Sequence, residues 1–202
     1  MAANRYPLIA REGWPSIALA GMAAVILAYQ LGWLWSLPLW LLAAVLLYLF
    51  RDPARPVPAS PLAVVSPADG RVSAVETVRD PYLERDAQRI SIRMHASGVF
   101  STRAPAEGKM LEPRRDKDRP HGVWLRTDGG DDLVIVMNRG PLRNPPRCYV
   151  RLGERVGQGQ RCGFVTLGSD IELYLPTSSR VKVRVGDQVR AGADVIAQLI
   201  HK

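Results

Sequence analysis

The chain has 202 residues, of which 47% are hydrophobic and 23% are charged, and its formal net charge at pH 7 is +8. This length fits one ordinary domain with an appendage, and the composition excludes an intrinsically disordered or collagen-like chain. Two cysteines are too few for a disulfide framework, and three widely separated histidines do not suggest a zinc site.

The N-terminal part is strongly apolar. No Asp, Glu, Lys or Arg occurs in Gly13–Phe50, a run nearly twice the roughly 20 residues that a helix needs to cross a bilayer. A break near its middle predicts two helices, about Pro15–Trp33 and about Leu37–Phe50. Ser36 is expected to cap the second helix, and Pro38 suits its first turn. Residues 1–50 are therefore predicted to form a membrane-anchoring helical hairpin.

Positive charges flank this hairpin on both sides but are absent from its turn. Arg5 and Arg11 precede it, and Arg51 and Arg55 follow it. The positive-inside rule then predicts a cell-membrane protein with both ends of the hairpin, and the soluble domain, on the cytoplasmic face. The second arm is short for a full span, so a re-entrant or interfacial hairpin remains open. A cleaved signal peptide is a poor alternative because the apolar run is too long.

The rest of the chain has a sequence pattern typical of a β protein. Residues 51–61 are proline-rich and are predicted to form an extended linker, and residues 62–202 are predicted to form a β-rich domain. No amphipathic helical pattern occurs after residue 51. The predicted strands are Leu62–Val65, Arg71–Thr77, Arg89–Met94, Val123–Arg126, Leu133–Met137, Cys148–Arg151, Phe164–Leu167, Ile171–Leu175, Arg180–Val185 and Val195–Ile200.

Two phrases in this domain occur twice. Residues 150–159 are echoed at 183–192, and residues 66–72 are echoed at 104–110. Each unit combines a strand, a glycine-containing turn and a second strand, which predicts a pseudo-symmetric β-sandwich or flattened barrel. The turns resemble the hammerhead turns of lipoyl and biotinyl carrier domains. A carrier role is disfavoured because no lysine stands at a matching tip.

A Gly-Ser dipeptide, Gly168-Ser169, lies between two β-type runs. Such a dipeptide is a common turn and is not by itself a site. Six phrases in this order behind an apolar hairpin, however, resemble the short bacterial branch of the phosphatidylserine decarboxylase family. They are Phe50-Arg-Asp-Pro, Ser66-Pro-Ala-Asp-Gly-Arg-Val, Arg89-Ile-Ser-Ile, Arg103-Ala-Pro, Cys148-Tyr-Val and Leu167-Gly-Ser. The resemblance covers nearly the whole chain and is weakest at about residues 113–144.

The resemblance implies a pyruvoyl-dependent enzyme made by self-cleavage. Ser169 would attack the Gly168 carbonyl, and the chain would split into a β chain of residues 1–168 and an α chain of residues 169–202. Position 169 would become a covalent pyruvoyl group, the cofactor on which phosphatidylserine, or a related serine-headed lipid, is decarboxylated to phosphatidylethanolamine. The implied partners are the phospholipid substrate and the membrane.

The resemblance also implies roles for three further residues. Asp69 matches the family's acidic residue linked to maturation, and Arg103 matches an arginine that could face phosphate or carboxylate. The family's acid–base histidine falls on Phe100, which cannot exchange protons. His95 is the candidate substitute, although on a continuous strand it would point away from the Phe100 face. Weaker candidates for this role are Ser101, Thr102 and His121.

The main alternative is a non-cleaving, membrane-anchored β-sandwich that binds lipid or a protein partner. A nucleic-acid partner is disfavoured because the basic residues are dispersed and do not alternate with aromatic ones. Whether the protein is a homo-oligomer is left open.

Overall fold

The computed structural model describes residues 8–58, 60, 62–95, 98–112, 121–140 and 145–200. The chain divides into two compact units, Met1–Ala54 and Arg55–Lys202. The first unit is helical, and the second is built of β-strands, with no helix among its described residues. The prediction of a mainly β protein that begins with an apolar helix pair is confirmed.

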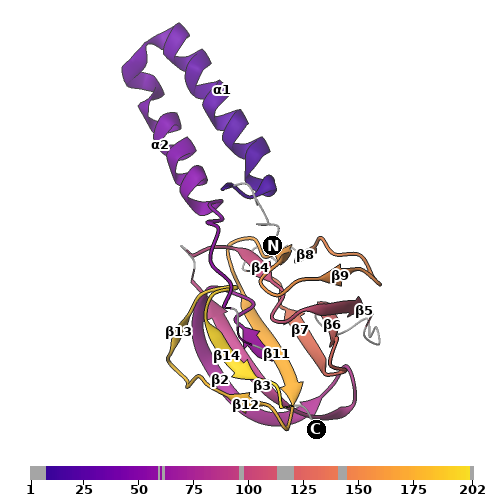
Figure 1. The fold of residues 1–202 in the computed structure, drawn as a ribbon. Coiled ribbons are helices and arrows are strands. Elements are labelled where there is room, and N and C mark those ends of the chain that lie inside the picture. Colours follow the sequence, from indigo (N-terminus) through magenta and orange to yellow (C-terminus); the bar gives the residue numbers. More distant parts are fainter. Residues whose placement is uncertain are drawn as a thin grey trace. The chain divides into compact units, whose positions relative to one another are not determined.

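The first unit is a hairpin of two helices (Figure 1). A short 3₁₀ turn, η1 (Arg11–Gly13), leads into α1 (Trp14–Leu31), and α2 (Trp33–Leu49) follows at once. Only Gly32 separates them, with φ of 94° and ψ of 164°. This left-handed conformation is open to glycine at little cost, so the chain can reverse within a single residue.

The predicted capping of the second helix is wrong. Helix α2 begins at Trp33, so Ser36 and Pro38 both lie inside it. The Ser36 hydroxyl donates a hydrogen bond of 2.7 Å to the Trp33 carbonyl and caps no free N–H group. The sequence pattern placed the break at the proline, whereas the positive φ of Gly32 reverses the chain one turn earlier. Pro38 therefore lies inside the helix, past the first turn, and cannot donate the N–H group that the Leu34 carbonyl would accept there.

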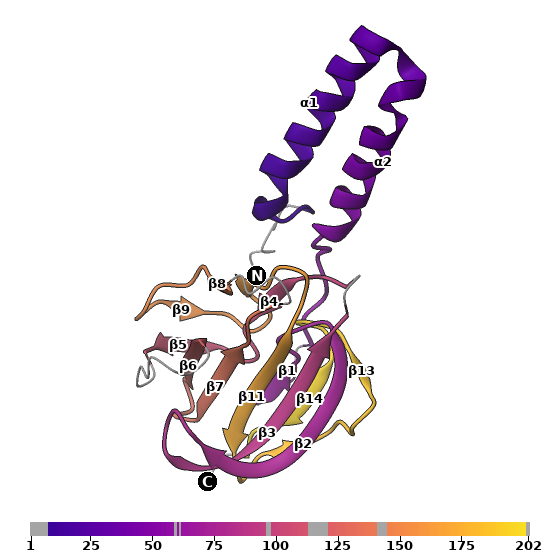
Figure 2. The same ribbon diagram turned by 180° about the vertical axis from the view of Figure 1, so that it is seen from behind.

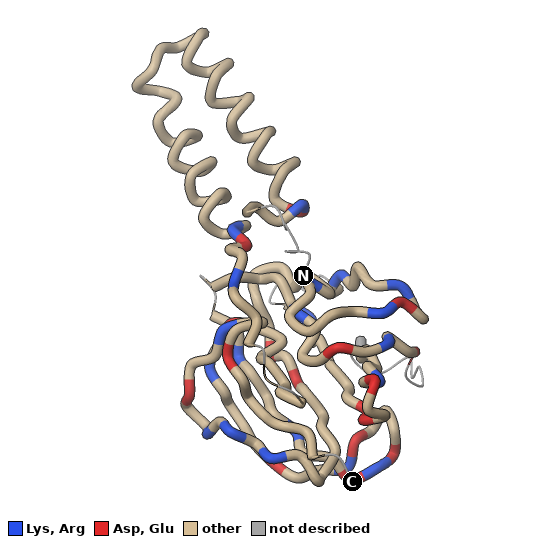
Figure 3. The backbone as a smooth tube through the Cα atoms, viewed as in Figure 1, with Lys and Arg blue, Asp and Glu red and all other residues tan. Residues whose placement is uncertain are grey.

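Both helices are apolar around their whole circumference. Leu19, Tyr29 and Leu34 are among many large apolar side chains that stay exposed, and Figure 3 shows charged residues only at the helix ends. A helix without a polar face suits a membrane interior better than water. Residues Arg11–Leu31 are long and apolar enough to cross a membrane, with a mean hydropathy of 1.5, and α2 is shorter.

The second unit contains three antiparallel sheets with the strand orders β13-β2-β3-β11-β7-β6-β5-β9, β1-β14-β12 and β4-β10-β8. In both ribbon views, β1 and β14 lie over one face of β2 and β3 (Figures 1 and 2). The strands are β1 (Ala63–Val65), β2 (Gly70–Asp80), β3 (Arg85–Met94), β4 (Ser101–Arg103), β5 (Gly108–Leu111), β6 (His121–Thr127), β7 (Asp132–Met137), β8 (Arg147–Cys148), β9 (Arg155–Val156), β10 (Arg161–Phe164), β11 (Asp170–Pro176), β12 (Arg180–Val181), β13 (Gln188–Val189) and β14 (Val195–Gln198).

Several predicted strands end early. Phe164 is the last residue of β10, and the rest of the predicted run Phe164–Leu167 forms a turn, because Leu167 has a φ of 61°, which no strand residue adopts. Strand β8 ends at Cys148, short of the predicted Arg151. The alternating run Arg180–Val185 pairs as a strand only at its first two residues. Its next residue, Lys182, still donates to the Ile196 carbonyl, and the chain then turns toward β13.

Equivalent hydrogen bonds confirm the internal repeat. In one half, Gly192 N–H donates to the Ser66 carbonyl and Gly186 N–H donates to the Val72 carbonyl; in the other, Gly159 N–H donates to the Ala104 carbonyl and Gly153 N–H donates to the Met110 carbonyl, all at 2.8 Å. The residues correspond at the spacings of the two sequence echoes. The fold is thus pseudo-symmetric, while the likeness of its turns to hammerhead turns stays a prediction.

Strand β11 runs through the middle of the large sheet, between β3 and β7. Its alternate residues Ile171, Leu173 and Leu175 are fully buried, as period-two alternation requires. Burial of these side chains fixes the register of β11, since a one-residue slip would move all three to the opposite face of the sheet. The residue directly before this strand, Ser169, is therefore held at the end of a rigid element.

Candidate active site

The site is built around the turn that leads into β11. Gly168 N–H donates to the Val165 carbonyl at 3.1 Å and closes the turn. Leu167 and Gly168 have φ values of 61° and 73°. The left-handed region costs a non-glycine residue such as leucine about 1–2 kcal/mol. This turn therefore carries backbone strain directly before Ser169.

The chain packs tightly around Gly168. A Cβ atom on Gly168 would lie 3.1 Å from Cβ of Met94, 3.6 Å from the His95 carbonyl oxygen and 3.7 Å from Cε1 of Phe100. The Met94 N–H group also donates to the Ser169 carbonyl at 3.2 Å. The end of β3 and the loop after it thus enclose the Gly168–Ser169 peptide.

The chain after β7 approaches the same peptide from another direction. The Ser169 hydroxyl, which is partly exposed, donates to the Arg139 carbonyl at 2.9 Å. A Cβ atom on Gly140 would lie 2.5 Å from the Thr166 carbonyl oxygen and 3.3 Å from that of Gly168. Only glycine at position 140 permits this close backbone approach.

His95 does not continue the strand toward Phe100. Strand β3 ends at Met94, and Gly98 N–H donates to the His95 carbonyl at 3.0 Å, so the chain turns between His95 and Phe100. The expectation drawn from a continuous strand therefore does not apply. His95 is exposed, whereas Phe100 is buried with its ring edge-on to Phe164 at 6.2 Å.

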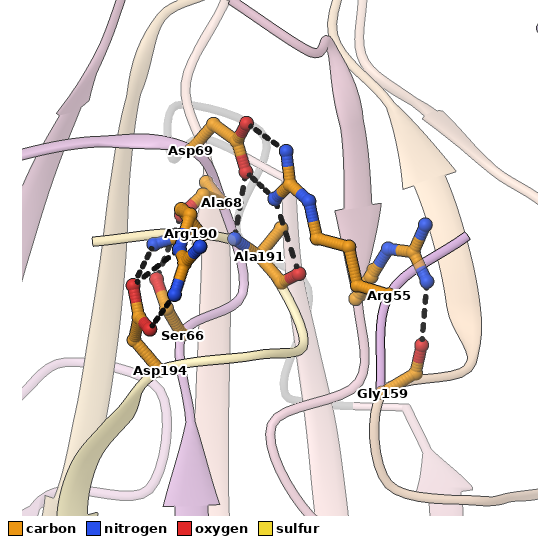
Figure 4. A network of polar contacts seen from close by, with 9 residues as sticks. Arg55, Ser66, Ala68, Asp69, Gly159, Arg190, Ala191 and Asp194 are labelled. Carbon is orange, nitrogen blue, oxygen red and sulfur yellow. Dashed lines mark hydrogen bonds and ion pairs between the residues drawn. The ribbon is translucent and has the colours of Figure 1, made fainter. Parts of the chain in front are cut away.

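Asp69 accepts three hydrogen bonds in a polar network (Figure 4). Both terminal nitrogens of Arg55 contact its carboxylate, with Nη2 at 2.7 Å from Oδ2 and Nη1 against Oδ1, and Ala191 N–H donates to Oδ1 at 2.7 Å. A two-pronged arginine contact fixes both the position and the orientation of a carboxylate. The position of a Cβ atom on Gly98 is 3.8 Å from Cβ of Asp69 and 3.1 Å from the His95 carbonyl oxygen. Gly98 thus lies between Asp69 and His95.

The turn that supplies Ala191 N–H is itself held by an ion pair (Figure 4). Arg190 donates to Asp194 from its backbone N–H at 2.8 Å and from Nη2 at 2.9 Å. The hydrogen bond from the Arg190 side chain lowers the pKa of the Asp194 carboxyl below its ordinary value, and burial opposes this only in part. The ion pair therefore stabilises the turn that orients Asp69.

Comparison with known proteins decides the family. The sequence model for phosphatidylserine decarboxylase matches residues 42–123 and 122–197. The chain belongs to the phosphatidylserine decarboxylase family. A phosphatidylserine decarboxylase proenzyme of Nitrosomonas europaea is 41% identical over 96% of both chains, and one of Aromatoleum aromaticum is 39% identical over 96% of this chain and 97% of its own. A solved structure, the glucose permease IIA from Mycoplasma capricolum, matches at 19% identity and a TM-score of 0.49 over 67% of this chain and 94% of its own.

Within this phosphatidylserine decarboxylase fold, the predicted site residues separate into two groups. Gly168, Ser169 and His95 belong to one packed cluster. Asp69 adjoins this cluster through Gly98, which lies next to both Asp69 and His95. Arg103 lies in β4, is only 3% exposed, and donates from Nη1 to the Gly159 carbonyl at 3.4 Å. Of the weaker candidates, Ser101 and Thr102 are buried in the same strand, and the side chain of His121 lies outside the described residues.

Sequence reasoning missed Arg55 and Gly140 as site residues. Arg55 was assigned to membrane topology, and its contact with Asp69 spans 14 residues that include the proline-rich segment. Gly140 follows a predicted strand and was assigned no role. The sequence signals that could have identified these two residues were weak. Arg55 comes shortly after the Phe50-Arg-Asp-Pro phrase, and Gly140 comes shortly after the end of β7.

Proposed function

We propose that this chain is a proenzyme that cleaves itself between Gly168 and Ser169 and then decarboxylates phosphatidylserine to phosphatidylethanolamine. The family membership and the name shared by relatives at about 40% identity over 96% of the chain support this function. The observation that carries the proposal is the strained Gly168–Ser169 turn, enclosed on one side by β3 and approached on the other by Gly140.

The cleavage begins with the Ser169 hydroxyl. Its oxygen attacks the Gly168 carbonyl carbon, the C–N bond breaks, and the peptide becomes an ester with a free amine at residue 169. Loss of the Cα proton of residue 169 then breaks the Cβ–O bond, and Gly168 leaves as a carboxylate. Water converts the resulting dehydroalanine to a pyruvoyl group and releases ammonia.

The turn favours this reaction in two ways. Left-handed strain at Leu167 raises the energy of the intact peptide, and breaking that peptide relieves it. The hydrogen bond from Met94 N–H to the Ser169 carbonyl holds residue 169 while the bond before it is broken. The Ser169 hydroxyl must leave the Arg139 carbonyl to attack, and this costs one partly exposed hydrogen bond.

The surroundings of residue 169 fit a pyruvoyl group. Ser169 is partly exposed, so a substrate amine can reach it, and its carbonyl already has a donor in Met94 N–H. A pyruvoyl group at this position supplies an electron sink that accepts the electron pair left by the departing carboxylate. The protein contributes the position of that group at the end of β11.

Proton transfers fall to Asp69 and His95 in this proposal. Phe100 packs beside Gly168 and carries no titratable group, so the role of the family's histidine must pass to other residues. Asp69 is held by Arg55 and Ala191, and His95 adjoins the Gly168 turn through its carbonyl. Positioned acid–base groups of this kind typically contribute about 10²–10⁴-fold to a rate.

The helical hairpin suits a lipid substrate. We propose that it anchors the protein in the cell membrane, with the β domain on the cytoplasmic face, where Arg51 and Arg55 follow the apolar run. The net charge of +8 also favours an anionic lipid surface. The substrate head group and the Ser169 turn would then meet at the interface.

The mass of the purified protein tests this function. Two fragments, residues 1–168 and 169–202, are expected, the smaller one having a blocked N-terminus that reacts with hydroxylamine. The wild type should convert phosphatidylserine to phosphatidylethanolamine in detergent micelles, and Ser169→Ala should stay uncleaved and inactive. A single wild-type chain with an intact serine would instead identify a non-cleaving lipid- or protein-binding relative.

A further inference from the structure

A pocket of about 500 Å³ is lined in part by the end of β3, where Met94 N–H donates to the Ser169 carbonyl. Its charged and polar lining consists of Arg71, Ser73, Arg93 and His95, and the exposed side chain of Val185 forms part of its rim. The lining comes from β2, from the end of β3 and from the turn before β13. Sequence reasoning assigned no function to Arg71 or Arg93.

The two arginines point to one side of the large sheet. Arg71 pairs with Arg93 across β2 and β3, and Arg93 pairs with Asp170 across β3 and β11. Side chains of residues that face each other across antiparallel strands lie on the same face. Positive charge is thus gathered on the face that adjoins the start of β11.

The charges of the pocket leave an excess of cations. Nε of Arg93 lies 3.1 Å from Oδ1 of Asp170 in an ion pair whose partners are both well exposed. Among the described residues, the Arg71 side chain makes no ion pair, and the nearby Asp187 carboxylate accepts the backbone N–H of Arg184. A guanidinium with free donors is well shaped to bind the oxygens of a phosphate group.

We propose that this pocket binds the phosphodiester group of the lipid substrate, with Arg71 as its main ligand and Arg93 as a second. This assignment rests on the proposed function. Met94 lines the pocket and also donates its N–H to the Ser169 carbonyl, so the pocket and the reacting residue share a wall. In a serine head group only two carbons separate the phosphate ester oxygen from the amine. The phosphate must therefore bind within a few ångströms of residue 169.

The rim of the pocket favours a lipid over a free phosphate ion. Val185 is 62% exposed at the tip of a turn in which Gly186 has a φ of 100°. An exposed valine next to two arginines offers apolar contact to the glycerol and acyl part of a phospholipid, which inorganic phosphate lacks. Arg103, the arginine that the family resemblance suggested for this role, is buried and holds a backbone carbonyl.

The test compares Arg71→Gln with Arg79→Gln in the full-length protein. Arg79 is an exposed arginine on the same strand and pairs with Asp86 at the opposite end of β2. Self-cleavage should be normal in both variants. Arg71→Gln should raise KM for phosphatidylserine in detergent micelles about tenfold or more, as expected for losing a charged hydrogen bond. Arg71→Lys should recover part of this loss, and Arg79→Gln should match the wild type. An unchanged KM in Arg71→Gln would overturn the assignment.

A binding experiment separates this proposal from the proposed function. Ser169→Ala should bind phosphatidylserine micelles and the water-soluble head group glycerophosphoserine, and Arg71→Gln in that background should weaken both. Inorganic phosphate should compete poorly. Equal, Arg71-dependent binding of inorganic phosphate would show a simple anion site and overturn the lipid assignment. If the wild type neither cleaves nor decarboxylates but this binding holds, the proposed function fails and the pocket stands.

Discussion

At the scale of single residues, the site depends on two glycines that meet at one carbonyl. Gly168 lies in the left-handed region against Met94, and Gly140 brings its own backbone to the Gly168 carbonyl oxygen. A Cβ atom would clash with backbone at position 140 and would be tightly packed against Met94 at position 168. The geometry of the Gly168–Ser169 peptide is therefore set by close backbone packing as much as by side-chain chemistry.

We predict that Gly140→Ala blocks most self-cleavage. The new methyl group would lie 2.5 Å from the Thr166 carbonyl oxygen, so residues 139–140 must move away from the reacting peptide. Such overpacking typically costs about 1–3 kcal/mol of stability. The cleaved fraction after expression, read by intact mass, checks this prediction. Gly157→Ala is the control, because a Cβ atom there has only one neighbour, at 3.8 Å; equal cleavage in both variants would contradict it.

Arg55 is predicted to act as a positioning residue for Asp69. Arg55→Gln removes the two-pronged contact and leaves only Ala191 N–H as a described donor to that carboxylate. Self-cleavage should slow about tenfold, less than the roughly 10²–10⁴-fold contribution of a positioned acid–base group, because Asp69 is misplaced but not removed. Arg55→Lys should restore part of the rate. The time course of fragment formation in cell-free synthesis measures this. A rate equal to that of Arg79→Gln would show that Arg55 has no such role.

Phe100→His should speed cleavage while lowering stability. The position of a Cβ atom on Gly168 is 3.7 Å from Cε1 of Phe100, so an imidazole at position 100 would stand beside the reacting carbonyl. Replacing a buried ring that packs edge-on against Phe164 costs packing energy, and the two effects have opposite signs. Cleavage at least tenfold faster, with a lower denaturant midpoint, is expected. A cleavage rate no higher than that of the wild type would contradict the prediction.

At the scale of elements, local sequence patterns predicted the helices and strands whose formation depends mainly on the residues within them. The uncharged run predicted the helix pair, and alternation located most strands of the large sheet. The misses occur where one residue's backbone overrides the pattern. Gly32 moved the start of α2 ahead of Ser36, and Leu167 turned a predicted strand end into a strained turn.

The candidate site was harder to predict because its contacts are distant in sequence. Gly168 and Ser169 were recognisable only through the family resemblance. The donors to Asp69 lie 14 and 122 residues away, at Arg55 and Ala191. Periodicity and propensity contain no information about such pairs. The short strands β4, β5, β9 and β13 were missed for a related reason, since strands of two to four residues depend on their partners.

The turn that orients Asp69 should be sensitive to acid. Because the folded-state pKa of Asp194 lies below its ordinary value of 3.8, the stabilisation it gives is present above that value and is lost as the pH falls through the folded-state pKa. Asp194→Asn should therefore lower the denaturant midpoint at pH 6, and this difference should shrink at pH 3. A difference that stays constant with pH would mean that the ion pair with Arg190 contributes nothing.

At the scale of the whole molecule, the proposed cleavage cuts between two halves of one sheet system. Three of the four strands after residue 169 pair with strands before it: β11 with β3 and β7, β13 with β2, and β14 with β1, while β12 joins the same sheet through β14. The small fragment thus supplies an internal strand of the large sheet.

This interleaving makes the mature enzyme one folded body despite its broken chain. The strand pairings that join the two fragments do not include the severed peptide bond, so the cleavage removes one covalent link and leaves these pairings in place. Native chromatography should elute both fragments together, and only a denaturant should part them. A small fragment that diffused away on its own would be inconsistent with β11 as the sheet's central strand. In the proposed sequence of events, the precursor first folds as one chain and brings all the strands into register. Cleavage then exposes the reactive terminus within a fold that is already complete.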